Sequence, residues 1–358
     1  MKRIGMLTSG GDCQALNAAM RGVVKSLHNS GEEVEIYGFL EGYKGLIRNN
    51  YKLLKADDFS GILTRGGTIL GSSRQPFKLM DQPTEDGINK VKAMKDTYKK
   101  LKLDCLVVLG GNGSQKTANL LSEEGCNVVS LPKTIDNDLW NTDKTFGFQS
   151  GINVATYCLD AIHTTADSHS RIFVVEVMGH KVGWLTLYAG MAGGADVILL
   201  PEIPYSVESV VKKVSERERA GKHFTVIAMA EGAVPKDVAE LPKKERKAVI
   251  AKQPNGTFSA QLAKEIEAAT GHETRVTVPG HIQRGGDTCP YDRVLSTSFG
   301  AAAAQLIIEE KYGNMVALHG DKIVPVPLSE VAGKLKVVPV DCHEIKCARA
   351  VGIAFGDE

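Results

Sequence analysis

The chain has 358 residues, of which 43% are hydrophobic and 24% are charged, and its formal net charge at pH 7 is +1. This composition is ordinary for a globular protein, and the length is sufficient for two lobes. A net charge this close to zero gives no reason to expect nucleic acid or an anionic membrane as a partner, so any bound anion must be held by a local site.

The sequence carries no targeting pattern that we recognise. The first residues lead directly into a strand pattern without the hydrophobic region of a signal peptide, and no apolar run approaches the length of a membrane span. The seven cysteines are odd in number and form no CxxC pair, which is typical of reduced, mostly buried thiols, and we expect a cytoplasmic protein. Cys342, His343 and Cys347 resemble one corner of a metal site but lack a second ligand pair.

The amino-terminal segment combines a strand with a glycine turn. Residues 2–7 predict a short strand, and Thr8–Asp12 forms a glycine-rich turn. From Cys13 to Leu27 apolar residues recur at helical spacing, so a helix is expected directly after the turn. Such a turn exposes backbone N–H groups beside the positive end of the helix dipole, which suits phosphate. It is not the GxGxxG pattern, and a tight connection without function is the alternative.

A second glycine-rich segment lies after the strand predicted at 34–40. Three glycines and three hydroxyl residues separate Arg65 from Arg74, so the backbone can approach a ligand closely. Arg74 is the candidate clamp, because a guanidinium can bridge phosphate oxygens. A surface arginine that closes a turn is the equally open alternative. Residues 85–102 predict a charged amphipathic helix without chemistry.

Two further strands end in polar loops. The strand predicted at 105–109 leads to Gly110–Ser114, with a helix from 115 to 122. The strand at 128–131 leads to Pro132–Asp138, where a lysine, a threonine and two aspartates fall within seven residues. Lys133 can hold a phosphate, Asp136 can take a proton from a hydroxyl, and Asp138 can bind a metal ion. The alternative is a solvated turn with an Asx cap.

These loops are expected to meet. Strands joined by right-handed crossovers lie side by side in a parallel sheet, so the loops after the strands at 2–7, 105–109 and 128–131 emerge at one edge. Ligands bind at the carboxyl ends of strands in such sheets. The three loops therefore predict a nucleotide or polyphosphate site.

The rest of the chain continues the alternation of strand and helix. We predict helices at 152–162 and 291–311, strands at 172–177, 197–200, 224–230 and 275–278, loops at 164–171 and 279–286, and a polar surface excursion at 234–259. The fold class is therefore α/β, with two Rossmann-like lobes, mainly parallel sheets and an active-site cleft between the lobes.

Six motifs in collinear order between Lys2 and about Gly300 resemble the 6-phosphofructokinase family, in particular its phosphofructokinase A type and mixed-substrate branch. They are residues 8–12, 110–114, 132–138, 168–171, 176–179 and 280–286. The resemblance implies phosphoryl transfer from ATP to the 1-hydroxyl of fructose 6-phosphate, giving fructose 1,6-bisphosphate in glycolysis, with Mg²⁺ as cofactor. It also implies a donor lobe at 1–138, a fructose 6-phosphate lobe at 139–300 and a helical extension at 301–358, with approximate boundaries.

The resemblance assigns roles by position. The base is Asp136, supported by Lys133, Thr134 and Arg74. The donor contacts are Gly11, Arg74, Gln75, Gly111, Asn112, Gly113 and Ser114. The sugar contacts are Thr134, Ile135, Asp136, Met178, Gly179, His180 and Glu231, and the 6-phosphate contacts are Arg171, Arg275, His281 and Arg284. The metal ligands are Asn112 and Asp138. Arg171 and Arg275 would reach the active site of a neighbouring copy, which implies a homo-oligomer, a tetramer or a dimer.

Three positions depart from the family pattern. Asn112 replaces an aspartate that helps to hold Mg²⁺, and a neutral amide is a weaker ligand. His163 replaces an effector-site arginine, so the usual nucleotide regulation is in doubt. Gly113 is expected of ATP users, because it leaves room for the α-phosphate, whereas Lys133 is expected of pyrophosphate users. Since a side chain at 113 blocks ATP by volume while a lysine can swing aside, we predict ATP as donor.

Other functions remain as alternatives. The first is a reversible, pyrophosphate-dependent phosphotransferase, and sedoheptulose 7-phosphate stays open as a second substrate. A lipid or dinucleotide kinase would not explain the loops at Arg171 and His281. A catalytically silent nucleotide or sugar-phosphate sensor would have no need of a base at Asp136.

Overall fold

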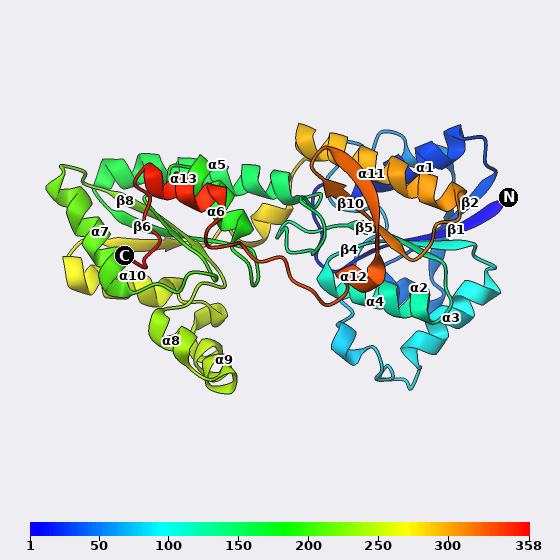
Figure 1. The fold of residues 1–358 in the computed structure, drawn as a ribbon, viewed down its shortest axis with the longest axis horizontal. Coiled ribbons are helices and arrows are strands. Elements are labelled where there is room, and N and C mark those ends of the chain that lie inside the picture. Colours follow the sequence, from blue (N-terminus) through cyan, green and yellow to red (C-terminus); the bar gives the residue numbers. More distant parts are fainter. The chain divides into compact units, whose positions relative to one another are not determined.

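A computed structural model describes residues 1–358 and divides the chain into two compact units. Unit 1 comprises residues 1–150 and 284–336, and unit 2 comprises residues 151–283 and 337–358 (Figure 1). These divisions differ from the expected boundaries at 138 and 300. The reason is local packing: Leu139 pairs with Leu335, and Ser150 bonds to Asp292, so residues 139–150 belong with unit 1.

Unit 1 is built on a seven-stranded sheet of order β11-β10-β5-β4-β1-β2-β3. Its strands are β1 (Lys2–Ser9), β2 (Val34–Phe39), β3 (Tyr51–Leu54), β4 (Cys105–Gly110), β5 (Val128–Pro132), β10 (Asn314–His319) and β11 (Lys322–Pro327). The central strands are parallel, and β3 and β11 pair in antiparallel fashion at the two edges. The prediction of a mainly parallel sheet is confirmed.

Helices cover both faces of this sheet. Those of unit 1 are α1 (Leu16–Asn29), α2 (Tyr43–Arg48), α3 (Lys90–Lys100), α4 (Asn112–Glu123), α11 (Pro290–Ile308) and α12 (Leu328–Val331), with 3₁₀ turns η1 (Ala56–Phe59) and η2 (Phe77–Leu79). Figure 1 shows α1 and α11 over one face and α2, α3 and α4 over the other. Because both faces are covered, β4 is buried at every residue and its sequence is continuously apolar.

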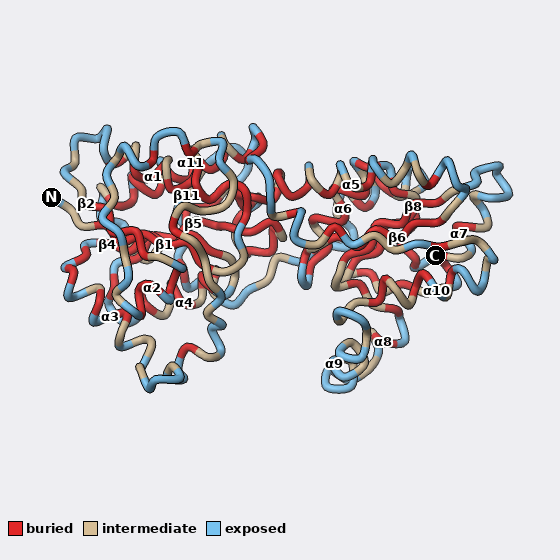
Figure 2. Tube along the Cα trace, turned by 180° about the vertical axis from the view of Figure 1, so that it is seen from behind, coloured by how far each residue is buried: buried red, intermediate tan, exposed pale blue.

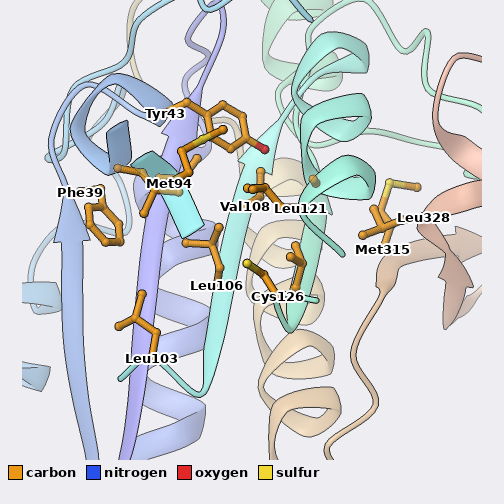
Figure 3. Packing of buried hydrophobic residues seen from close by; sticks show 14 of the residues in the cluster. Phe39, Tyr43, Met94, Leu103, Leu106, Val108, Leu121, Cys126, Met315 and Leu328 are labelled. Carbon is orange, nitrogen blue, oxygen red and sulfur yellow. The ribbon is translucent and has the colours of Figure 1, made fainter. Parts of the chain in front are cut away.

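One hydrophobic core of unit 1 lies between the sheet and the second group of helices. Leu106 and Val108 of β4 belong to the same buried cluster as Met94 of α3 and Leu121 of α4. Figure 3 shows this packing, with the Tyr43 ring at one end of the cluster. Burial of each such side chain contributes about 1.5–3 kcal/mol. This core fixes the helix that begins at Asn112 against the sheet.

Unit 2 contains a smaller sheet of order β7-β8-β6-β9, in which all pairs are parallel. Its elements are α5 (Phe148–His169, beginning in unit 1), β6 (Ile172–Val177), α6 (Trp184–Ala192), β7 (Val197–Leu199), α7 (Val207–Arg219), β8 (Thr225–Ala230), α8 (Lys236–Glu240), α9 (Lys243–Lys252), η3 (Pro254–Gly256), α10 (Ser259–Thr270), β9 (Thr274–Thr277), η4 (Gly280–Arg284) and α13 (His343–Ala350). Figure 2 shows the central strands of both sheets buried along most of their length, namely β1, β4 and β5 in unit 1 and β6 and β8 in unit 2.

Several predicted element bounds were wrong. Helix α4 begins at Asn112 and not at Gln115, so three residues predicted in a loop form the first helical turn. Helix α5 extends to His169, so most of the loop predicted at 164–171 is helical. The excursion predicted at 234–259 contains α8 and α9, and Val249 and Ile250 of α9 pack against the core of unit 2. None of the helices is long and apolar enough to span a membrane.

Two glycines allow α1 and α11 to pack in backbone contact. A Cβ on Gly300 would lie 2.6 Å from the Cα of Gly22, and a Cβ on Gly22 would lie 3.0 Å from the carbonyl oxygen of Thr297. Both glycines lie within helices and have ordinary helical backbone conformations. Glycine is favoured there because the two helices lie so close together that a side chain would clash.

We therefore predict that Gly300→Val lowers the free energy of unfolding by roughly 2 kcal/mol, because the added methyl groups must push α1 and α11 apart. Ala301→Val places the same side chain on the exposed face of α11 and should cost less than about 1 kcal/mol. Denaturant unfolding followed by circular dichroism measures both. Equal losses of unfolding free energy in the two variants would contradict the close packing of α1 against α11.

Candidate active site

The three predicted loops emerge side by side at one edge of the unit 1 sheet. Strand β4 pairs in parallel with β1 on one side and with β5 on the other. In register, Ser9 is opposite Gly110, and Gly110 is opposite Pro132, so the three strands end together. The expectation that the loops after these strands share one sheet edge is confirmed.

The first loop, Gly10–Asp12, is bonded to the second glycine-rich segment. Gly10 has a positive φ of 86°, which glycine adopts without strain. Its N–H donates to the carbonyl of Ser73 at 3.1 Å, and the Ser72 hydroxyl donates to the Gly10 carbonyl at 2.6 Å. Arg74 follows directly, exposed and without an ion pair, and Gln75 comes next. The structure thus brings these two predicted donor contacts close to the first loop.

Two cations lie against the same loop. Lys133 is only 3% exposed and donates to the carbonyl of Gly11. Burial lowers the pKa of Lys133, while the charges of nearby Asp136 and Asp138 oppose that shift. Arg284 donates from Nη1 to the carbonyl of Asp12 at 3.1 Å, and its Nε is buried without a partner. The two cations therefore give this edge a concentrated positive charge.

Gly11 leaves room for the guanidinium of Arg284. A Cβ built on Gly11 would overlap the guanidinium of Arg284. Arg284 was predicted to hold the 6-phosphate of the sugar together with Arg171, Arg275 and His281, but the structure places it at the glycine turn of unit 1. This contact was not foreseen, because it joins positions far apart in the sequence.

The second loop leads into the N-terminus of α4. Gly111 is the N-cap residue, and Asn112, Gly113 and Ser114 form the first turn, whose N–H groups have no partners within the helix. A Cβ on Gly113 would meet no atom within 4 Å, so this position faces open space. The Tyr43 hydroxyl donates to the Ser114 carbonyl at 2.9 Å and holds the turn against the core. A helix N-terminus of this kind suits an anion.

A buried glutamine, missed in the sequence, joins the second and third loops. The Gln115 amide donates to the carbonyls of Gly110 and Leu131 at 2.9 and 3.2 Å, and its oxygen accepts from the Ser130 hydroxyl at 2.6 Å. Gln115 is fully buried, so loss of these bonds would leave polar groups unsatisfied. The side chain therefore fixes the ends of β4 and β5 relative to each other. In the sequence, the only signal for this role of Gln115 is its position directly after the glycine-rich segment 110–114.

The third loop holds Asp136 in a fixed backbone. The Thr134 hydroxyl accepts from the Asp136 N–H at 3.0 Å, and the Thr145 hydroxyl donates to the Thr134 carbonyl at 2.8 Å. Ile135 is fully buried and anchors the loop. The Oδ1 of Asp136 is buried without a hydrogen-bond partner. A carboxylate oxygen in this condition can accept a hydrogen bond from a ligand hydroxyl.

The two predicted metal ligands are joined through one backbone segment. Asn112 donates from Nδ2 to the carbonyl of Lys334 at 2.7 Å, and Asp138 accepts at its carbonyl from the N–H of Lys336 at 3.0 Å. Burial, with the charge of Asp136, raises the pKa of Asp138 to about 7. A cation near this carboxyl would favour its ionised form.

These residues fit Mg²⁺ as part of its coordination. The carboxylate of Asp138 and the amide oxygen of Asn112 are the hard oxygen ligands that Mg²⁺ prefers. No cluster of three or more histidine, cysteine, aspartate or glutamate side chains could hold a metal ion alone. The remaining ligands would have to be donor phosphates and waters, as is usual for Mg²⁺ bound with a phosphorylated substrate.

Unit 2 brings together four of the predicted sugar contacts at the carboxyl ends of β6 and β8. The N–H groups of Gly179 and His180 donate to Glu231 Oε1 at 3.2 and 2.6 Å. The Met178 N–H donates to Gln283 Oε1 at 3.2 Å. Glu231 therefore shapes the backbone that follows β6, in addition to any direct contact with a ligand.

Arg171 and Arg275 lie at the opposite end of this sheet. Arg171 precedes β6, and Arg275 is opposite Phe173 in β9, and both pair with the carboxylate of Glu273. A strand rises about 3.3 Å per residue, so Met178 is roughly 17 Å further along than Phe173. His281, exposed in η4, follows the carboxyl end of β9. Unit 2 therefore separates the predicted 6-phosphate arginines from its sugar contacts.

Three loops that contain glycine or aspartate lie at one edge of a parallel sheet, which is typical of α/β proteins that bind phosphorylated ligands. Comparison with known proteins agrees with this class. Residues 3–307 match the phosphofructokinase family pattern. The chain is 53% identical over 360 residues to the ATP-dependent 6-phosphofructokinase of Spirochaeta thermophila, with 99% of this chain and 98% of the relative covered. It is 48% identical over 374 residues to that of Propionibacterium freudenreichii, with 99% of each covered.

A solved structure shows the same fold. Phosphofructokinase of Pichia pastoris in the T-state superposes with a TM-score of 0.79 at 33% identity, over 92% of this chain and 35% of that longer chain. The chain belongs to the phosphofructokinase family, and the resemblance noted in the sequence is confirmed.

The two glycines of the donor loops should respond differently to alanine. Gly11→Ala must displace Arg284 and break its bond to the Asp12 carbonyl, which we expect to lower the free energy of unfolding by about 1 kcal/mol. Gly113→Ala meets no atom and lies in the first turn of a helix, so it should leave stability unchanged or raise it by up to about 1 kcal/mol. Denaturant unfolding measures the stability of both variants. A loss of unfolding free energy in Gly113→Ala alone would contradict the prediction.

Proposed function

We propose that this protein catalyses phosphoryl transfer from ATP to the 1-hydroxyl of fructose 6-phosphate, giving fructose 1,6-bisphosphate, as a step of glycolysis. The observation that carries the proposal is the buried, unpartnered carboxylate oxygen of Asp136, held where the three loops meet. A site that only binds a nucleotide needs no such base. The relatives at 53% and 48% identity are named ATP-dependent 6-phosphofructokinases, which supports the same reaction here.

The donor contacts are assigned to unit 1. The triphosphate would lie along the N–H groups of Gly11 and of the first turn of α4, where the helix dipole favours negative charge. The exposed, unpaired guanidinium of Arg74 would bind terminal phosphate oxygens. Mg²⁺, held by Asp138 and Asn112 with donor phosphates, supplies neutralisation of the phosphate charge when it is bound.

The geometry favours ATP over pyrophosphate. The ammonium of Lys133 is engaged by the carbonyl of Gly11, so it is not directed into the space beside Gly113. Because a Cβ on Gly113 would meet nothing, that space can accept the α-phosphate of a nucleotide. The presence of a lysine at 133 is the one feature that favours pyrophosphate, and it keeps the pyrophosphate-dependent enzyme as the second candidate.

The chemical step follows from these positions. Asp136 accepts the proton of the sugar 1-hydroxyl as the oxygen attacks the terminal phosphorus, and the leaving diphosphate departs in line. The Thr134 hydroxyl orders the backbone at Asp136 by accepting from the Asp136 N–H. Lys133 and Arg284 stabilise the negative charge that moves to the leaving group.

The sugar contacts come from unit 2. Met178, Gly179, His180 and Glu231 would hold the sugar hydroxyls, since Glu231 already orders that backbone. Arg171 and Arg275 are too far along the sheet to act with them, so they would serve the 6-phosphate site of a neighbouring copy. The protein would then be a homo-oligomer, a dimer or a tetramer, with sites completed by two copies.

The direct test measures fructose 1,6-bisphosphate formed from fructose 6-phosphate and Mg²⁺, with either ATP or pyrophosphate. The proposal expects a kcat/KM for ATP at least tenfold above that for pyrophosphate. A higher value for pyrophosphate would replace the first candidate by the second, and absence of product with both donors would reject the proposal.

Replacing the base gives a second test. Asp136→Asn should lower kcat by roughly 10³-fold, because general base catalysis contributes 10²–10⁴-fold, while calorimetry should still detect fructose 6-phosphate binding. Asp57→Asn makes the same change at an exposed position of η1 and should leave kcat within twofold. Retention of more than a tenth of kcat in Asp136→Asn would remove Asp136 from the role of base.

A further inference from the structure

The segment Lys334–Lys336 lies along two loops of the candidate site. Its first carbonyl accepts from Asn112 Nδ2, Leu335 bridges to Leu139, and the Lys336 N–H donates to the carbonyl of Asp138. The segment therefore connects the first turn of α4 to the loop that carries Asp136 and Asp138. It lies outside the six motifs and has no role in the function described so far.

The side chain of Lys336 extends this connection. Its Nζ donates to the carbonyls of Thr142 and Asp143, both at 2.8 Å. One residue thus holds the loop at Asp138 through its backbone and at 142–143 through its ammonium group. The bond to the Thr142 carbonyl is partly buried, whereas the bond to the Asp143 carbonyl is exposed.

The opposite side of the same loop is bonded to the end of β10. The Asp143 N–H donates to the Leu318 carbonyl, and the Thr142 hydroxyl accepts from the Leu318 N–H at 3.0 Å. Residues 138–143 are therefore held between β10 and Lys336. Loss of the lysine side chain would remove its two bonds at 142–143, while the backbone bond from Lys336 to Asp138 and the bonds to Leu318 would remain.

We propose that Lys336 is a positioning residue that sets Asp138, and with it Asp136, for the Mg²⁺-bound phosphoryl donor. This inference rests on the proposed function. Partners that orient a metal ligand without touching the metal typically change metal affinity or activity by 10–100-fold when they are removed.

The test compares Lys336→Met with Lys334→Met. The Lys334 side chain is exposed, and only its backbone carbonyl takes part in the segment, so Lys334→Met is a matched control. For Lys336→Met we expect a rise of about tenfold in the Mg²⁺ concentration that gives half-maximal rate and a fall of about tenfold in kcat. The KM for fructose 6-phosphate should stay within twofold, because the sugar contacts of unit 2 are untouched.

Calorimetry provides a readout independent of turnover. Each variant is titrated with ATP in the presence of Mg²⁺. We expect about tenfold weaker ATP binding by Lys336→Met and wild-type binding by Lys334→Met. Lys336→Arg should recover part of the affinity, because it retains donors for the two carbonyls. A lower melting temperature with an unchanged Mg²⁺ requirement would show a structural role only and overturn the inference, as would equal effects of both lysine variants. If the wild type binds Mg²⁺ and ATP but forms no product, the proposed function fails while this comparison still decides the role of Lys336.

Discussion

The buried ammonium group of Lys133, bonded to the carbonyl of Gly11, is the interaction on which the site of unit 1 depends. It joins the loop after β5 to the loop after β1. Burying an ammonium group is unfavourable unless nearby groups compensate for the lost water, and here a carbonyl, Asp136 and Asp138 compensate in part, since burial still lowers the pKa of Lys133. The bond from Lys133 to Gly11 therefore ties the position of the glycine turn to that of the loop that carries Asp136.

Other buried contacts extend the same connection. Gln115 holds the ends of β4 and β5 together, and Arg284 adds a second cation at the glycine turn. The segment 334–336 connects α4 to the loop of Asp138. Because each loop is bonded to the next, the donors and acceptors are ordered before a ligand arrives. Electrostatic catalysis requires such prior order, since the charges then need not reorganise during the reaction.

The sequence predicted the parts of this site that depend on local pattern. A buried strand followed by glycines indicates a loop at a sheet edge, and the right-handed crossover rule placed β1, β4 and β5 side by side. Asp136 was proposed as a base because a lysine, a threonine and two aspartates follow a buried strand, and the family resemblance assigned it that role. The parallel sheets and the family followed from the same motifs.

Long-range packing could not be predicted in this way. The contacts of Arg284 with Asp12 and of Lys334 with Asn112 join residues more than 200 positions apart. Lys133 was expected to swing aside and leave room for a nucleotide, and only the fold shows its bond to Gly11. Helix α6 was missed because it is apolar on all sides and lacks helical periodicity. The start of α4 was misplaced because Gly113 is a poor helix former.

We propose that the open space at Gly113 receives the nucleotide while Lys133 stays on the glycine turn. A crystal structure with Mg²⁺ and a non-hydrolysable ATP analogue would test this arrangement. We expect the α-phosphate beside Gly113, the phosphates on the N–H groups of Gly11 and the first turn of α4, and the Lys133 ammonium still bonded to the Gly11 carbonyl. An analogue bound elsewhere, or Lys133 turned into the space beside Gly113, would contradict it.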